Sequence, residues 1–255
     1  MRGGAQAQLM RCDDEAFYVV KFQNNPQGSR ILANELLGTR LAARLGLPVP
    51  AAAVVEVREN LIGETEDLVI QLPRGRARCA PGQQFGSRFP VQPAETVVFD
   101  FLPDEHLRST VNIADFCGML VFDKWTCNTN GRQAIFFCPR GEQRYRALMI
   151  DQGFCFNAGE WNFPDAPLRG LYARHRVYEG VRGIDSFEPW LARVESKIGE
   201  AALEEAASEI PPQWYNAQLS ALEQLIEQLL RRRKRVRELV ISAWKSSAQP
   251  FPNWK

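Results

Sequence analysis

The stretch FYVVKFQNNPQGSRILANELLGTRLAARL, residues 17–45, contains a strand pattern followed directly by a helix pattern. Residues 17–22 are rich in aromatic and β-branched side chains, which favour a strand. NNPQGS then interrupts regular structure, and Ser29 can cap a helix whose leucines recur at helical spacing. Gly46 follows where a helix-ending glycine is favoured, and two prolines beyond it prevent the helix from continuing.

Outward from this strand and helix, the sequence predicts a small antiparallel sheet. A short strand is expected at Gln8–Arg11, and two further strands near Ala53–Val57 and Leu68–Leu72. Residues 73–95 are rich in Gly, Pro and Arg and are predicted to form a long loop, of a length that is uncommon without a functional role. TVVFDFL, Thr96–Leu102, is apolar enough for a buried strand.

After residue 103 the pattern becomes mainly helical. Ile113–Asp123 has helical periodicity and leads into a polar loop, and two short strands are predicted at Gln133–Phe137 and Arg146–Ile150. The later helices are expected at Phe187–Ile198, at Ala201–Glu209 and from about Trp214 to Trp244. The sequence therefore predicts an α+β fold with two lobes, residues 1–103 with the sheet and residues 104–255 with most of the helices.

Composition limits the class of protein. The 255 residues are 45% apolar and 24% charged with a net charge of +1, which is typical of a globular chain. No apolar run approaches the roughly 20 residues that span a membrane, and the N-terminus lacks a signal-peptide core, so we expect a cytoplasmic protein. The six scattered cysteines include no CxxC pair, which favours reduced thiols over disulfides or a zinc site.

The segment GGAQAQ near the N-terminus is a candidate phosphate-binding loop. Adjacent glycines allow backbone N–H groups to approach a phosphate where a Cβ would obstruct it. A flexible chain end is the alternative. The candidate residues of this loop are Gly3, Gly4, Ala5 and Gln6.

Lys21 is a candidate ligand of nucleotide phosphates. It lies at the end of an apolar strand, so its ammonium either escapes to solvent or points into a cleft. Glu35, in the helix that follows, can pair with Lys21 and hold it on the phosphates. An ordinary surface pair at a sheet edge is the alternative, and such pairs contribute little to stability.

Two further motifs supply acidic and amide groups. In Asp123-Lys-Trp-Thr-Cys-Asn128, the aspartate can orient or deprotonate an accepting hydroxyl while the asparagine oxygen helps to hold Mg²⁺. Asn130 competes for the metal role, and an Asx-rich turn is the alternative for the whole motif. Asp151 directly follows an apolar strand and precedes Gln152-Gly153, which suits a carboxylate that binds a hard cation.

The four motifs in this order resemble the HipA-like kinases of the protein-kinase-like superfamily. The similarity covers most of residues 1–200 and rests on GGAQ, VVKF, ANELLGTRLAARLGLPVP, FDKWTCN and IDQG. It implies a bilobal fold and transfer of the ATP γ-phosphate, in characterised members to a serine or threonine of a protein. Asp123 would be the catalytic residue, and Asn128 and Asp151 would hold the metal.

The chain also departs from the family pattern. The toxin members carry an extra N-terminal domain, whereas this sequence starts at the phosphate loop, so we expect a minimal form. The loop has no serine for autophosphorylation, and Trp125 or Thr126 replaces the histidine often found in the catalytic motif. Regulation of the toxin type is therefore not expected.

From the sequence we expect an ATP- and Mg²⁺-dependent phosphotransferase whose acceptor is a protein. Adenine would lie against the segment from Phe99 through Asp100 and Phe101. One alternative is a nucleotide-binding pseudokinase that binds an acidic partner through the basic run Arg231–Arg237, RRRKRVR. Another is a lipid or small-molecule kinase that binds an anionic acceptor with this basic run and the arginines of the 73–95 segment. A solvated helix face is the simplest interpretation of the basic run.

Overall fold

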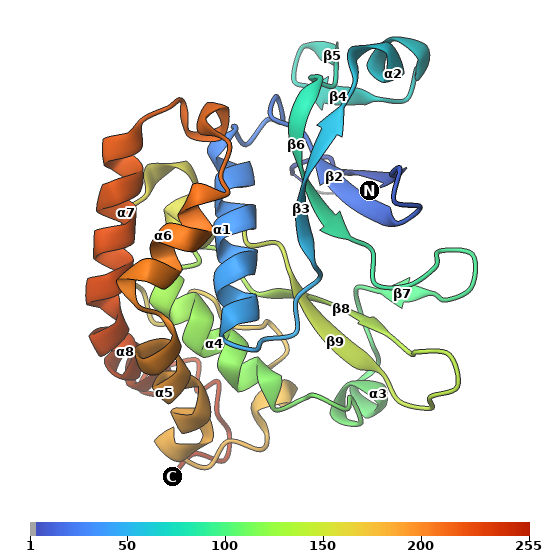
Figure 1. Cartoon of the computed structure of the whole chain (residues 1–255). Coiled ribbons are helices and arrows are strands. Elements are labelled where there is room, and N and C mark those ends of the chain that lie inside the picture. Colours follow the sequence, from blue (N-terminus) through green and yellow to red (C-terminus); the bar gives the residue numbers. More distant parts are fainter. Residues whose placement is uncertain (1–3) are drawn as a thin grey trace.

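A computed structural model describes residues 4–255 of the chain, so Gly3 of the candidate phosphate loop lies outside the described residues. The N-terminal part contains a four-stranded antiparallel sheet in the order β1-β2-β6-β3 (Figure 1). Its strands are β1 (Gln8–Arg11), β2 (Phe17–Lys21), β6 (Gly82–Arg88) and β3 (Ala52–Val57).

Helix α1 (Arg30–Arg44) lies between this sheet and the C-terminal helices (Figure 1). Eleven of its fifteen residues are buried, because it is covered on more than one side. Ser29 occupies the N-cap position but makes no capping hydrogen bond with its side chain to the described residues. Gly46 ends the helix with φ +75°, a conformation that favours glycine. The helix predicted from sequence is therefore confirmed at both ends.

The prediction of a loop over residues 73–95 is wrong. Strand β4 (Val69–Leu72) forms a hairpin with β5 (Gly75–Arg78), and β6 is an inner strand of the main sheet. The composition of β6 does not indicate a strand, because its buried residues include the polar Gln84, which is 0% exposed, and Gly86 stands where a β-branched residue is usual. A Cβ at Gly86 would lie 2.5 Å from Val55 Cγ2, so the neighbouring side chain occupies that space.

The expected buried strand over residues 96–102 is also wrong in extent. Only β7 (Val98–Phe99) is extended and paired, and it forms the edge of a three-stranded sheet with β8 (Gln133–Phe137) and β9 (Arg146–Ile150). Val97 is 65% exposed and Phe101 is 59% exposed, so these apolar residues do not build a core. The predicted bounds of β8 and β9 are confirmed.

The C-terminal part is helical, as predicted. Its helices are α3 (Asp104–Arg108), α4 (Asp115–Thr126), α5 (Glu188–Lys197), α6 (Glu200–Ser208), α7 (Leu219–Arg232) and α8 (Val236–Trp244). The single helix expected over 214–244 is instead α7 and α8 joined by a 3₁₀ helix, Arg233–Arg235, and a separate 3₁₀ helix forms at Pro212–Tyr215. A short helix, α2 (Glu59–Glu64), was not predicted.

Helix α4 continues three residues beyond Asp123, and Cys127 then adopts the left-handed conformation with φ 52°. The polar loop expected directly after Asp123 therefore starts later than predicted, because the helix ends only at Thr126. The main hydrophobic core extends from α1 and the inner face of the sheet to the C-terminal helices, and a smaller core lies under α2 and the β4–β5 hairpin. The α+β class is confirmed.

All six cysteines have free thiols, and four of them are buried. Within residues 4–255, no helix combines the length and the apolar character needed to cross a membrane.

Candidate active site

Three charged side chains from distant parts of the chain meet beside the sheet. Lys21, the last residue of β2, donates from Nζ to Asp151 Oδ1 at 2.8 Å and also contacts Glu35 of α1. The exposed fractions of the Lys21, Glu35 and Asp151 side chains are 13%, 3% and 24%. The structure therefore brings together the two residues predicted to form a pair and the predicted metal ligand.

The segment after β9 is held on α1 through Glu35. The backbone N–H of Gln152 donates to Glu35 Oε2 and that of Gly153 to Oε1, each at 3.0 Å. A Cβ at Gly153 would lie 2.7 Å from Ile31 Cγ2 and 3.1 Å from Glu35 Oε1, so only glycine fits between these groups. Asp151 itself adopts a left-handed backbone, with φ +63°.

The electrostatics of the three groups reflect burial and mutual attraction. Burial raises the pKa of Glu35 to about 7, and nearby Asp151 adds to the rise, although Lys21 opposes it. Burial also acts to raise the pKa of Asp151, but the attraction of Lys21 and Arg132 and the hydrogen bonding of the carboxylate together outweigh it, and the pKa is lowered. Burial acts to lower the pKa of Lys21, and the two carboxylates outweigh it and raise the pKa. Lys21 therefore stays a cation at physiological pH.

The charged cluster borders a cleft of about 360 Å³. The N-terminal turn covers part of this cleft with Gly4, Ala5 and Gln6, the described members of the predicted phosphate loop. The side chain of Gln6 pairs with the backbone of Gln71, donating to its carbonyl and accepting from its N–H, both at 2.7 Å. This pair fixes the turn against the β4–β5 hairpin.

The segment expected to contact adenine is only partly at the cleft. Val98 and Asp100 line it. Phe99 instead packs edge-on against Tyr145, with 5.9 Å between ring centroids. Phe101 carries the guanidinium of Arg174 over its ring, 4.4 Å from the centroid. The structure thus places Asp100 at the cleft and directs both phenylalanines toward other partners.

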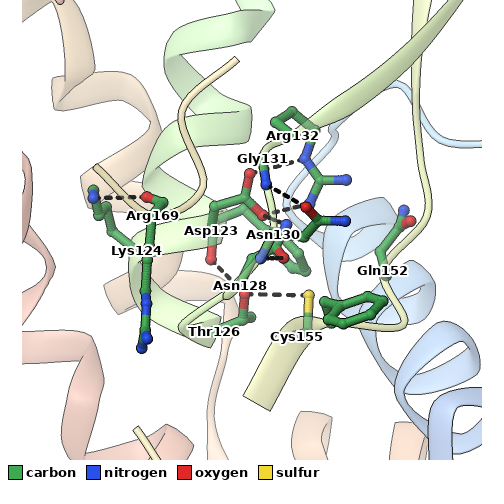
Figure 2. A network of polar contacts seen from close by, with 12 residues as sticks. Asp123, Lys124, Thr126, Asn128, Asn130, Gly131, Arg132, Gln152, Cys155 and Arg169 are labelled. Atoms are coloured by element: carbon green, nitrogen blue, oxygen red, sulfur yellow. Dashed lines mark hydrogen bonds and ion pairs between the residues drawn. The ribbon is translucent and has the colours of Figure 1, made fainter. Parts of the chain in front are cut away.

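Asp123 and Asn128 lie together in a buried network (Figure 2). Asn128 Nδ2 donates to Asp123 Oδ1 at 3.0 Å, and Arg132 Nε donates to Asp123 Oδ2 at 2.8 Å. The side chains of Asp123 and Arg132 are both 0% exposed. Neither Asp123 nor Asn128 is among the residues that line the cleft, so the structure joins this pair to Arg132 and not to the cleft surface.

Three residues near the site were missed from sequence. Gln133 Nε2 donates to Asp151 Oδ2 at 2.6 Å, and Gln152 borders the cleft. Arg132 is the third. Arg132 and Gln133 stand in NTNGRQ between the predicted helix and an apolar strand, and a polar run at a strand entry is the signal that could have identified them.

The residues around Asp151 fit a hard cation bound with nucleotide phosphates. Asp151 supplies carboxylate oxygens, which are among the ligands that Mg²⁺ prefers, whereas Gln133 turns its amide nitrogen, and not its oxygen, toward Asp151. The side-chain oxygen Oε1 of Gln152 is buried and accepts no hydrogen bond from the described residues. A buried oxygen of this kind normally has a partner, so one more donor is needed to satisfy it. In Asn128 the amide oxygen accepts the N–H of Asn130 at 3.0 Å and is already used inside the protein.

The comparison with solved structures shows the fold. The Helicobacter pylori proinflammatory kinase CtkA is 14% identical and has a TM-score of 0.58, with 96% of this chain and 95% of that chain covered. Hydra Fam20 is 11% identical, with a TM-score of 0.52 and coverage of 97% and 83%. A Golgi casein kinase with Mn and ADP bound is 12% identical, with a TM-score of 0.53 and coverage of 97% and 72%. The chain therefore has the protein-kinase-like fold.

A comparison with curated protein sequences gives no significant match. The family model described as HipA-like kinase matches residues 1–157, which is more than half of the 255 residues and includes Lys21, Glu35, Asp123 and Asp151. The chain belongs to the HipA-like kinase family.

Proposed function

We propose that this chain is a cytoplasmic kinase that transfers the γ-phosphate of ATP, with Mg²⁺, to a serine or threonine of a protein. The strongest support is the cluster of Lys21, Glu35 and Asp151 at a cleft that the Gly4–Gln6 turn also lines. Phosphoryl transfer depends mainly on positioning and charge stabilisation, and a buried lysine beside a metal-binding carboxylate supplies both. The Mn and ADP in the similar Golgi casein kinase agree with this choice of cofactor.

Each residue of the cluster has a role in this proposal. Lys21 has three N–H donors, and contacts with Glu35 and Asp151 leave the third for a phosphate oxygen. Glu35 keeps Lys21 in place and holds the backbone at Gln152 and Gly153. Bound Mg²⁺ would neutralise charge on the phosphates, with Asp151 as its protein ligand.

A second candidate function is nucleotide binding without transfer, and the burial of Asp123 favours it. Sequence assigns Asp123 to the accepting hydroxyl, and that role stays a prediction. Both oxygens of its carboxylate already accept hydrogen bonds from Arg132 or Asn128, and the side chain is 0% exposed. Contact with an acceptor would require Arg132 to move away.

The remaining alternatives have less support. In the basic run, Arg231 pairs with Glu227, Arg232 with Asp165 and Arg237 with Glu188. These charges are compensated within the chain, which weakens the case for an acidic partner. In the segment proposed to bind lipid or another anion, Arg78 donates to the carbonyls of Ile62 and Thr65 and so ties its hairpin to the end of helix α2.

The test is to measure binding and transfer separately. Wild-type protein should show a higher melting temperature with ATP and Mg²⁺ and should incorporate label from γ-labelled ATP into itself or an acceptor protein. Both effects should disappear in Lys21→Met, and transfer should disappear in Asp151→Asn. Lys234→Met and Asp67→Asn, which change exposed residues away from the cleft, serve as charge-matched controls. Binding without any transfer would support the second candidate, and a lack of ATP binding would refute both.

A further inference from the structure

The guanidinium of Arg132 lies against Asp123 of helix α4 (Figure 2). It also contacts the residue before Asp151. Its Nε and Nη2 donate to the two oxygens of Asp123, and its Nη1 donates to the carbonyl oxygen of Ile150 at 2.6 Å. One edge of the Arg132 guanidinium therefore binds helix α4, and another edge binds the end of strand β9. The bidentate pairing fixes the orientation of the planar group.

Asp123 is itself held from several sides. Asn128 donates to it, and it lies in the continuous helix α4. Gly170, with φ +77°, passes so close that a Cβ there would collide with Asp123. Because neither charge of the Asp123–Arg132 pair reaches solvent, each side chain needs the other, and the pair has little freedom to rearrange.

The backbone at Asp151 needs such support. A non-glycine residue with φ +63° is strained and persists when its surroundings determine it. On one side Arg132 holds the carbonyl of Ile150, and on the other Glu35 holds the N–H groups of Gln152 and Gly153. The metal-binding candidate is thus clamped before and after its own position.

We propose that Asp123 and Arg132 are positioning residues, which hold Asp151 in the geometry that binds a divalent cation on the nucleotide phosphates. This inference rests on the proposed function, because it takes Asp151 as the ligand of that cation. Asp123 acts through Arg132 and the Ile150 carbonyl and does not touch the acceptor. Partners that orient a metal ligand typically change metal affinity by about 10–100-fold when they are removed.

The experiment uses the double variant Asp123→Leu/Arg132→Met in the full chain. It removes both buried charges at once, which preserves folding better than leaving one of them unpaired. Mn²⁺ affinity is measured by electron paramagnetic resonance with ADP present, and ADP affinity is measured by calorimetry without metal. We expect Mn²⁺ affinity to fall about 10-fold or more while metal-free ADP affinity changes less than about 2-fold. Glu188→Gln/Arg237→Met removes the ion pair between α5 and α8 as the control and should leave Mn²⁺ affinity unchanged.

Hydrogen exchange at residues 150–153 provides a readout that needs no ligand. The amides of Gln152 and Gly153 should exchange faster in the double variant than in wild type and in the control. A folded double variant with wild-type Mn²⁺ affinity and wild-type exchange would overturn the inference. So would Asp123→Asn with wild-type Mn²⁺ affinity and no transfer, because Asp123 would then act on the acceptor. If the wild type binds neither ADP nor Mn²⁺ while the exchange result holds, the proposed function fails and the clamp on Asp151 stands.

Discussion

At the scale of single residues, the site is arranged by charges that the protein supplies to itself. Lys21 is enclosed by two carboxylates, and Glu35 is enclosed by Lys21 and two backbone N–H groups. This arrangement orders the lysine before any phosphate arrives, so little side-chain entropy remains to be lost on binding. Because the three side chains satisfy one another, removing any one of them alone should lower the unfolding free energy.

Replacing Lys21 by methionine tests this interdependence. The change leaves Glu35 and Asp151 close together without a cation, and removal of one partner from a buried pair costs about 3 kcal/mol or more of unfolding free energy. Urea titration measures the loss. Lys21→Met/Glu35→Gln should recover part of the stability, because one of the two repelling carboxylates is then neutral. Equal stability of the single and double variants would contradict the prediction.

Glu35 also gives the stability of the protein a dependence on pH. Its pKa is raised from 4.5 to about 7 in the folded state, so the folded chain binds a proton that the unfolded chain releases between these values. This contribution is fully present below about pH 4.5 and is lost as the pH rises through 7. The unfolding free energy of wild type should therefore fall relative to that of Glu35→Gln between pH 5 and pH 8. Parallel curves in urea titrations across this range would contradict the assignment.

The site could be predicted from sequence only where position along a strand or helix determined it. Lys21 and Asp151 each stand at a strand end, and local pattern was enough to select them. Asp123 was selected by its spacing to Asn128, which holds equally for a loop and for the end of a helix. Its burial depends on Arg132 and on Gly170, whose approach to α4 leaves no local pattern in the sequence.

At the scale of secondary structure, apolar content predicted strands well when it agreed with burial. Strands β8 and β9 alternate clearly, and their bounds were confirmed. In strand β6 polarity and burial disagree, because the polar Gln84 is buried. Its side chain donates to the carbonyls of Ala80 and Pro81 at 2.9 and 3.0 Å. For residues 96–102 the prediction was wrong in the reverse direction, since Val97, Phe99 and Phe101 are apolar but remain exposed at or beside the edge strand β7.

A substitution at Gly86 tests whether close packing against the neighbouring strands explains why a glycine stands in the inner strand β6. In Gly86→Ala the new Cβ would meet Val55 Cγ2 at 2.5 Å and Tyr18 Cδ1 at 3.2 Å, so side chains on both neighbouring strands must give way. We expect a loss of about 1–3 kcal/mol of unfolding free energy, measured by chemical denaturation. Gly63→Ala in helix α2 is the matched control, since no atom lies within 4 Å of the added Cβ. An equal effect of the two substitutions would contradict the packing role of Gly86.

At the scale of the whole molecule, the main core joins both parts of the chain. It includes Leu32 and Leu36 of α1, Phe85 of the sheet and Leu225 of α7. The family model ends at residue 157, but the similarity in fold to CtkA covers 96% of the chain. The C-terminal helices are therefore part of the kinase fold, and we expect one cooperative unfolding transition.

Phe251 provides the sharpest test of this cooperativity, because it lies far from the cleft and four residues from the C-terminus. It is 3% exposed and packs against Tyr178 and Phe187, with ring centroids 5.3 and 5.4 Å apart. Phe251→Ala should cost about 3–5 kcal/mol and lower the melting temperature of the whole chain in one calorimetric transition. Leu219→Ala, at a residue that is 58% exposed, is the control. If Phe251→Ala produced a second transition while the N-terminal sheet kept its melting temperature, the two parts would unfold independently and the shared core would not determine stability.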